Sequence, residues 1–126
     1  MAKILVVDDE PEIRRLLRTW LEAERYEVFE AKDGAQAFEL YKQVEPDLVI
    51  TDIYMPNKEG LGLIRKLRSG NSRAKVIAMT GGSSIDSSDP LLVAEMLGAE
   101  LLVRKPFTDN EMLEAVARIL RGSSAY

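Results

Sequence analysis

Residues 4–11 of the chain are Ile-Leu-Val-Val-Asp-Asp-Glu-Pro, a run of four apolar residues followed by three acidic residues and a proline. A short apolar run bounded by a turn is typical of a strand buried on both faces of a parallel sheet. Proline favours the first turn of a helix, because its backbone angle is already helical and its missing N–H would have no partner there. These residues therefore predict a buried strand over Lys3–Val7, an acidic turn, and a helix over Pro11–Ala23.

An apolar strand followed by an amphipathic helix occurs five times along the chain. The further strands are expected at Glu27–Ala31, Leu48–Thr51, Ala74–Met79 and Leu101–Val103. The further helices are expected after the N-cap residue Asp33, around Gly60–Arg68, over Pro90–Gly98, and after a capping box that begins at Thr108. This (βα)5 alternation predicts the α/β class: a doubly wound, flavodoxin-like, five-stranded parallel sheet with helices on both faces.

The spacing of apolar residues also predicts which face of each helix is buried. The expected core positions are Ile13, Leu16, Leu17, Trp20 and Leu21 in the first helix, Ala37, Phe38, Leu40, Tyr41 and Val44 in the second, Leu61, Ile64 and Leu67 in the third, and Leu113, Val116, Ala117 and Leu120 in the last. The segment 81–89 is rich in glycine and serine and is expected to be a polar loop.

Length and composition limit the class of protein. A chain of 126 residues, 46% of them hydrophobic and 30% charged, is expected to be one soluble globular domain with a real core. Its longest apolar runs fall far short of the ~20 residues that cross a bilayer, and its N-terminus is unlike a signal peptide. We therefore expect a cytoplasmic protein that does not enter a membrane. The net charge of -4 argues against a nucleic-acid-binding surface on this domain.

The chain contains neither cysteine nor histidine. The lack of cysteine excludes disulfides and thiolate metal sites, and the lack of histidine removes the commonest general base and the commonest transition-metal ligand. Only oxygen ligands remain, which favours Mg²⁺, Mn²⁺ or Ca²⁺ as a bound metal.

Polar residues stand where the predicted strands end. They are Asp8 and Asp9 after the first strand, Asp52 after the third, Thr80 after the fourth and Lys105 after the fifth. The carboxyl ends of parallel strands meet at one edge of an open sheet, where ligands bind. Carboxylates gathered there would repel one another unless a cation lay between them, and a lysine beside them suits a phosphate group.

Each of these residues also has a purely structural interpretation. Asp8 and Asp9 would act as a cap for the following helix, and Asp52 as a turn residue. Thr80 would cap the next segment, and Lys105 would be solvated surface. The coincidence of all of them at strand ends favours a metal and phosphate site.

The chain resembles the receiver domains of response regulators, which serve two-component signalling. The resemblance rests on residues 6–11, Asp52-Ile53-Tyr54-Met55-Pro56, Thr80-Gly81, Gly98-Ala99 and Lys105-Pro106-Phe107, in that order and at matching strand positions. It covers essentially the whole chain. We expect a receiver domain over residues 1–121, with residues 122–126 forming a flexible tail or the start of a linker.

The resemblance implies a role for each matching acidic residue. Asp52 would accept a phosphoryl group from a histidine kinase, a histidine phosphotransfer protein or a small phosphodonor. Asp9, Asp52 and the backbone carbonyl of Tyr54 would ligate Mg²⁺, with Mn²⁺ as a substitute, and Asp8 would help directly or through water. The protein would catalyse only its own phosphorylation and dephosphorylation, so it is not expected to act on other substrates as an enzyme.

The remaining matches concern the phosphoryl group and the response to it. Lys105 would pair with this group, Thr80 would move to hydrogen-bond it, and the Lys105–Pro106 peptide bond would be cis. Gly81 and Gly82 would belong to the segment that switches with Thr80. Output would pass to a downstream protein or to a C-terminal domain absent from these residues.

Two departures from the family pattern suggest hypotheses of their own: the residue at position 102, and a loop after Thr80 that is a few residues longer than usual and rich in glycine and serine. Leu102 stands where the family usually has an aromatic residue, so the usual threonine-to-aromatic relay is altered. We expect output through Gly81–Asp89 and the helix Pro90–Leu97, because residues 91–97 are apolar nearly all round, as in a helix that docks against a partner. Burial of this helix by the domain's own sheet is the alternative. Tyr54 and Gly82 stand where the family tunes the lifetime of the aspartyl phosphate, and a bulky Tyr54 predicts slow self-dephosphorylation.

Three other functions fit parts of the pattern. A receiver-like interaction module that is never phosphorylated stays open because of Leu102. A flavodoxin-like cofactor carrier is disfavoured, because the acidic turn at residues 8–10 would repel its phosphate. A metal-dependent phosphatase that acts on other substrates is disfavoured, because nothing in the sequence indicates a substrate pocket. The kinase, the pathway and the role of the loop 81–89 are left open, as is a homodimer through the fourth helix, fifth strand and fifth helix.

Overall fold

The computed structural model describes residues 1–53, 59–70, 74–81 and 98–122. Its strands are β1 (Lys3–Val7), β2 (Glu27–Ala31), β3 (Leu48–Asp52), β4 (Lys75–Thr80) and β5 (Leu101–Arg104). Its helices are α1 (Pro11–Ala23), α2 (Gly34–Val44), α3 (Glu59–Ser69) and α5 (Asp109–Leu120). The helix expected over Pro90–Gly98 lies outside the described residues except for Gly98, and the expected tail does so except for Gly122.

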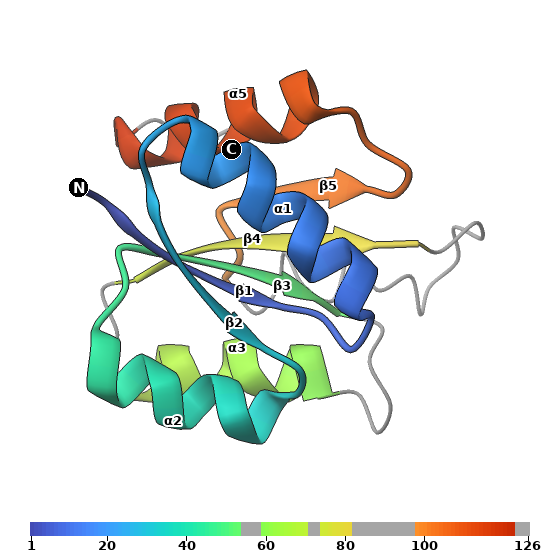
Figure 1. The fold of residues 1–126 in the computed structure, drawn as a ribbon. Helices are drawn as coiled ribbons and strands as arrows, with labels where there is room; N and C mark the ends of the chain where they lie inside the picture. The colour runs from blue at the N-terminus through green and yellow to red at the C-terminus, as the bar shows by residue number, and fades with distance from the viewer. Residues whose placement is uncertain (54–58, 71–73, 82–97, 123–126) are drawn as a thin grey trace.

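The five strands form one parallel sheet in the order β2-β1-β3-β4-β5 (Figure 1). From β1 the chain winds outward to β2, then returns past β1 to β3 and continues in the opposite direction. The carboxyl ends of the adjacent strands β1 and β3 therefore flank the switch point where doubly wound sheets bind ligands. This arrangement confirms the fold class expected from the sequence.

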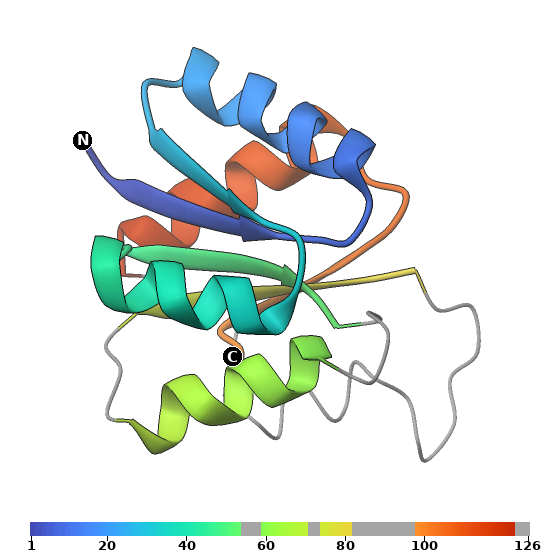
Figure 2. The same cartoon turned by 60° about the horizontal axis from the view of Figure 1, so that its bottom comes forward.

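Helices cover both faces of the sheet, as Figures 1 and 2 show. On one face, α1 and α5 pack against the sheet around a cluster that includes Ile4, Val6, Leu17 and Val116. On the other, α2 and α3 enclose a cluster that includes Leu5, Val7, Ala37 and Ile64. Alternate residues of β1 enter the two clusters, because successive side chains of a strand point to opposite faces. Two separate cores thus hold the central strands from both sides.

Local signals set the helix starts as expected. Pro11 occupies the first turn of α1. The Asp33 side chain accepts a hydrogen bond from the Gln36 N–H at 2.8 Å and caps α2. Both bonds of the capping box are present at α5, between Thr108 and Glu111. These caps satisfy N–H groups that have no partner within the helix.

The expected buried faces were partly wrong. Leu16 of α1 is 41% exposed. In α5 the buried residues are Met112, Ala115, Val116 and Ile119, and in α3 they include Leu63. The expected core residues that are only partly buried are Ile13, Trp20, Phe38, Leu40, Tyr41, Val44, Leu61, Leu113, Ala117 and Leu120. Helix α5 carries two overlapping apolar stripes with helical spacing, and the rotation of the helix on the sheet selects one of them. Among the described helices, none is long and apolar enough to cross a membrane.

Candidate functional site

Four of the predicted site residues meet at the carboxyl edge of the sheet. Asp8 directly follows β1, Asp52 ends β3, Thr80 ends β4 and Lys105 directly follows β5. Asp8, Thr80 and Asp52 are buried, with exposed fractions of 0%, 1% and 4%. Polar groups so deeply buried need partners, since an unpaired buried charge is strongly unfavourable. These three side chains are therefore held inside the protein and not on its solvated surface.

Lys105 supplies the pairing. Its Nζ lies 2.9 Å from Asp8 Oδ2 and 3.1 Å from Asp52 Oδ2, so one ammonium bridges the ends of two strands. The backbone N–H of Lys105 donates to the carbonyl of Thr80 at 2.7 Å. The Lys105–Pro106 peptide bond is cis, as the resemblance implied. The lysine is thus held at its backbone by β4 and at its side-chain tip by two carboxylates.

The three carboxylates form a compact group. One oxygen each of Asp8, Asp9 and Asp52 lie within 4.8 Å of one another, with Asp9 exposed at the rim and the other two buried. The donors are all oxygens, and of the three only Asp9 is exposed to water. This set fits Mg²⁺, which takes one or two carboxylates and keeps several waters. Tyr54, the other predicted ligand, lies outside the described residues.

The electrostatics of the site favour a bound cation. Burial raises the pKa of Asp8, although the Glu10 N–H and the Lys105 ammonium both favour the ionised carboxylate. Burial would lower the pKa of Lys105, but its hydrogen bond to Asp8 and the negative charges of Asp52 and Asp8 outweigh burial and raise this pKa. Lys105 therefore stays charged, while ionised Asp8 would gain from a further positive charge.

Two contributors to the site were missed by the sequence analysis. A Cβ built on Gly60 would lie 2.0 Å from the carbonyl oxygen of Asp52 and 2.6 Å from Ile53 Cα, so the first turn of α3 rests directly on the backbone of Asp52. The signal was a glycine inside a helical pattern, which often marks a close approach of backbones. Arg14 is the other, because its Nη1 donates to the Asp8 carbonyl at 2.6 Å.

The residues predicted for switching are only partly described. Gly81 is exposed and lies beside Lys105, because a Cβ placed there would be 3.9 Å from Lys105 Cδ. Leu102 is partly buried and packs against the cluster under α2 and α3. Gly82, the rest of the loop and the helix expected over Pro90–Leu97 lie outside the described residues.

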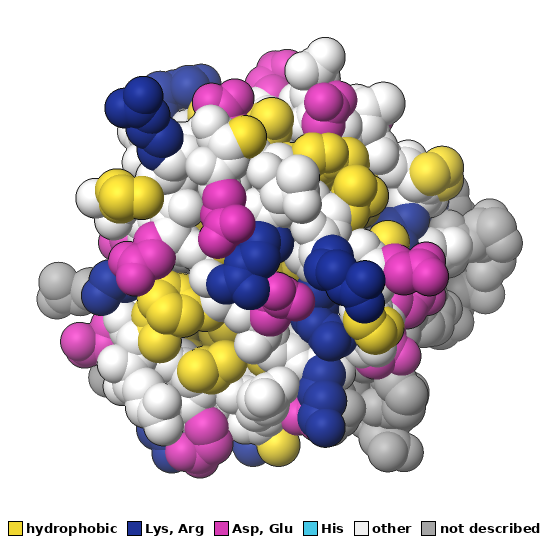
Figure 3. Space-filling model, viewed as in Figure 1, with side chains coloured by type: hydrophobic (Ala, Val, Ile, Leu, Met, Phe, Trp, Pro, Cys, Tyr) yellow, Lys and Arg dark blue, Asp and Glu magenta, His cyan; other side chains and the backbone are white. Residues whose placement is uncertain are grey.

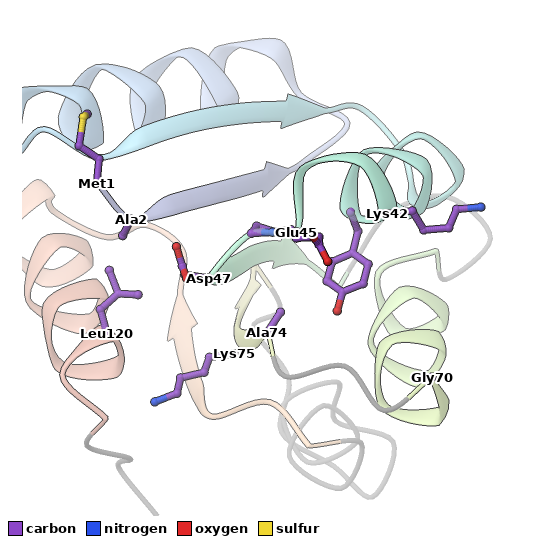
Figure 4. A pocket seen from close by; sticks show the side chains of 11 residues that line it. Met1, Ala2, Lys42, Glu45, Asp47, Gly70, Ala74, Lys75 and Leu120 are labelled. Atoms are coloured by element: carbon purple, nitrogen blue, oxygen red, sulfur yellow. The ribbon is translucent and has the colours of Figure 1, made fainter.

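A hollow of about 930 Å³ lies at the opposite, amino-terminal edge of the sheet (Figure 4). Two of its charged residues already serve the fold. The Asp47 carboxylate accepts the Lys3 N–H at 2.8 Å, and Lys75 Nζ donates to the carbonyl of Ile119 at 3.2 Å. The grouping of carboxylates and lysine at the other edge is therefore the better candidate for chemistry.

A family model described as the response regulator receiver domain matches residues 4–117. Protein CcdB of Bacillus subtilis is 40% identical over 121 residues, which cover 95% of this chain and 98% of that protein. The chemotaxis protein CheY of Halobacterium salinarum is 36% identical over 121 residues, with the same coverage of 95% and 98%. The transcriptional regulatory protein CpxR of Escherichia coli is 36% identical over 123 residues, 98% of this chain and 51% of that protein.

Solved structures of receiver domains and chemotaxis proteins are similar to this chain as well. A CheY-like receiver domain of Methanospirillum hungatei has a TM-score of 0.88 at 27% identity, covering 97% of this chain and 95% of that chain. The chemotaxis protein CheY4 of Vibrio cholerae has a TM-score of 0.85 at 27% identity, covering 94% and 98%. The chain spans about half the length of the transcriptional regulators that it matches. It belongs to the receiver domain family of response regulators, the proteins of two-component signalling.

Proposed function

We propose that the protein is a phosphorylation-activated switch in which Asp52 accepts a phosphoryl group in a Mg²⁺-dependent reaction. The observation that carries this proposal is the contact of Lys105 Nζ with both Asp8 and Asp52, beside a third carboxylate at the switch point of the sheet. The donor would be a histidine kinase or a histidine phosphotransfer protein. A small phosphodonor would serve in its place.

In the transfer step, an Asp52 carboxylate oxygen attacks phosphorus and forms a P–O bond. The P–N bond of the donor phosphohistidine breaks, and its electron pair stays with the imidazole; with acetyl phosphate, a P–O bond breaks and acetate leaves. No general base is needed, because an ionised carboxylate is already a nucleophile. Water later cleaves the aspartyl phosphate, which releases phosphate and restores Asp52.

The transferred group carries negative charge that the site must offset. Asp9, Asp52 and the Tyr54 carbonyl would hold Mg²⁺ or Mn²⁺, with Asp8 helping directly or through water, and the metal would supply positive charge to the phosphoryl group. Lys105 would turn from Asp52 toward the new phosphoryl group while Asp8 keeps its ammonium in place. The Thr80 hydroxyl, at the adjacent strand end, would donate a hydrogen bond to the same group. This movement would start the switch through Gly81 and Gly82.

A surface beside Lys105 suits a protein donor. A hollow of about 390 Å³ is lined by Ile13, Leu16, Gly81, Lys105, Pro106 and Phe107. Leu16 is 41% exposed, and with Ile13 and Phe107 it gives this hollow an apolar lining beside Lys105. We propose that a helix bearing the donor histidine packs its apolar side against Leu16 and thereby brings phosphorus to the site. In Figure 3, basic and acidic side chains are interleaved over the face shown, which suits a protein partner better than nucleic acid.

The proposed switch also has a domain extent, a location and an output. The receiver domain would span residues 1–121 and act in the cytoplasm. Output would pass to a separate protein, or to a C-terminal domain as in the longer transcriptional regulators. Leu102 would not relay the signal as an aromatic residue would, so the segment Gly81–Leu97 would carry it, with or without a homodimer through the fourth helix, β5 and α5.

The test is intact-mass measurement after incubation with acetyl phosphate and Mg²⁺. We expect one phosphoryl adduct in the native protein, none in Asp52→Asn, and none with a chelator. Phosphorylated kinases or phosphotransfer proteins should give the same adduct. An adduct that persists in Asp52→Asn would place the acceptor elsewhere. No adduct from any donor would favour the receiver-like module that binds a partner without being phosphorylated.

A further inference from the structure

We propose that Arg14 is a positioning residue for the metal-binding carboxylates, because it holds the turn that carries Asp9. This inference rests on the proposed function for its metal. Arg14 lies in the first turns of α1 and is only 16% exposed. Its Nη1 donates to the carbonyl oxygen of Asp8 at 2.6 Å, and its Nε donates to Glu30 Oε1 at 3.2 Å. The guanidinium therefore links α1, β2 and the end of β1.

The turn around Asp9 is closed by three hydrogen bonds. The Glu10 N–H donates to Asp8 Oδ1 at 2.9 Å, and the Arg14 N–H donates to the Glu10 carbonyl at 3.2 Å. The guanidinium bond to the Asp8 carbonyl is the third. Arg14 takes part in two of the three bonds, once through its backbone and once through its side chain. Of the two bonds that Arg14 makes, only the one from its side chain can be removed by substitution without disturbing the helix.

Asp9 depends on this turn for its position. Within the described residues its carboxylate makes no hydrogen bond or ion pair, and the side chain is exposed. Asp8, by contrast, is held by Lys105 and by the Glu10 N–H. The placement of the Asp9 oxygen within 4.8 Å of those of Asp8 and Asp52 therefore follows from the backbone of the turn. Groups that hold a metal ligand in place contribute to metal affinity even though they do not touch the metal.

Glu30 makes Arg14 rigid. Its Oε1 accepts from Arg14, and its Oε2 accepts from Arg18 Nη1 at 2.5 Å. Glu30 stands opposite Val6 in the β1–β2 register, so it lies close to the site but outside it. Because its carboxylate neutralises the guanidinium, Arg14 acts here through hydrogen-bond geometry more than through net charge.

Arg18 provides a matched control. It lies one turn further along α1, pairs with the same Glu30 and donates to the Val28 carbonyl at 2.7 Å. No hydrogen bond from Arg18 reaches the turn of residues 8–10 in the described part of the chain. If the arginines merely bind α1 to β2, substitution of either should have the same effect. If Arg14 positions the turn, only its substitution should change metal binding.

The experiment measures Mg²⁺ affinity by calorimetry on the unphosphorylated full chain, for the native protein, Arg14→Gln, Arg14→Lys, Arg18→Gln and Glu30→Gln. Loss of a group that orients a metal ligand typically weakens binding by about 10-fold or more, and we expect this for Arg14→Gln. Arg14→Lys keeps a single donating nitrogen in place of the guanidinium group, so its Mg²⁺ affinity should fall between those of Arg14→Gln and the native protein. Glu30→Gln should also be intermediate, and Arg18→Gln should match the native protein. Thermal unfolding in chelator checks that each variant is folded.

A second readout separates this inference from the proposed function. With acetyl phosphate, Arg14→Gln should need more Mg²⁺ for half-maximal phosphorylation but reach the native rate at saturation. Equal Mg²⁺ affinity in Arg14→Gln and Arg18→Gln would overturn the inference, and the phosphorylation of Asp52 would stand. Arg14-dependent Mg²⁺ binding without any phosphorylation would support the inference and contradict the proposed function. A native protein that binds no Mg²⁺ would overturn both.

Discussion

Substitution of Gly60 by alanine should damage both the fold and the site. The added Cβ would lie 2.0 Å from the Asp52 carbonyl oxygen, 2.6 Å from Ile53 Cα and 2.9 Å from the Asp52 carbonyl carbon. All three are backbone atoms, and β3, to which Asp52 belongs, is buried along its length. No side chain can rotate away to relieve the contact. Helix α3 or the end of β3 must therefore shift.

The size of the effect follows from two opposed contributions. Alanine in place of glycine favours a helix by about 1 kcal/mol. Overpacking a closed contact costs about 1–3 kcal/mol and occasionally more, and a contact of 2.0 Å with backbone belongs at or beyond the top of that range. We expect Gly60→Ala to lose at least about 2 kcal/mol of unfolding free energy.

Gly62 in the same helix is the control. A Cβ on Gly62 would have no neighbour within 4 Å, so only the helix preference should act. Gly62→Ala should therefore gain about 0.5–1 kcal/mol. The assay is urea unfolding followed by circular dichroism, with the rate of phosphorylation by acetyl phosphate measured at low urea. If Gly60→Ala were as stable as Gly62→Ala, the close approach of α3 to Asp52 would be refuted.

Three further predictions concern the lysine, the partner surface and the lifetime of the phosphorylated state. Because the pKa of Lys105 is raised in the folded protein, its stabilisation is complete below the unfolded value of about 10.4 and is lost as pH rises through the folded value. In urea unfolding at alkaline pH, the unfolding free energy of the native protein should therefore fall more steeply with pH than that of Lys105→Met. Equal slopes for the two proteins would contradict the ion pairs of Lys105. Leu16→Ala, at a position 41% exposed, should change stability by at most about 0.5 kcal/mol and slow transfer from a cognate kinase while leaving acetyl phosphate labelling intact. Tyr54→Ala should shorten the half-life of the phosphorylated protein in intact-mass time courses, and an unchanged half-life would argue against obstruction by Tyr54.

Much of the site was predictable because its residues stand directly at the ends of apolar runs. Asp52 and Lys105 are 53 positions apart, yet each follows a buried strand, and parallel strands bring their carboxyl ends together. The caps at Asp33 and Thr108 were predictable for a similar reason, since a cap depends on residues within one turn. No knowledge of the packing was needed for either conclusion.

Other features depend on distances between elements. The sequence places Asp8 and Asp9 side by side, but only the fold shows that Asp8 is fully buried while Asp9 is exposed. The burial of Met112 in place of Leu113 as a core residue of α5 depends on how the helix is rotated over the sheet. Both stripes have helical spacing, so periodicity alone could not choose between them.

By itself, the sequence determined the alternation of strands and helices, the parallel sheet, and the gathering of Asp8, Asp52, Thr80 and Lys105 at one edge. These follow from local apolar patterning and from the polarity of parallel strands. Only the tertiary structure decided that Gly60 lies against the Asp52 backbone and that Arg14 pairs with Glu30 while it donates to the Asp8 carbonyl. The physical reason is that such contacts depend on the order of the strands and on how each helix packs on the sheet, which no local pattern of residue types specifies.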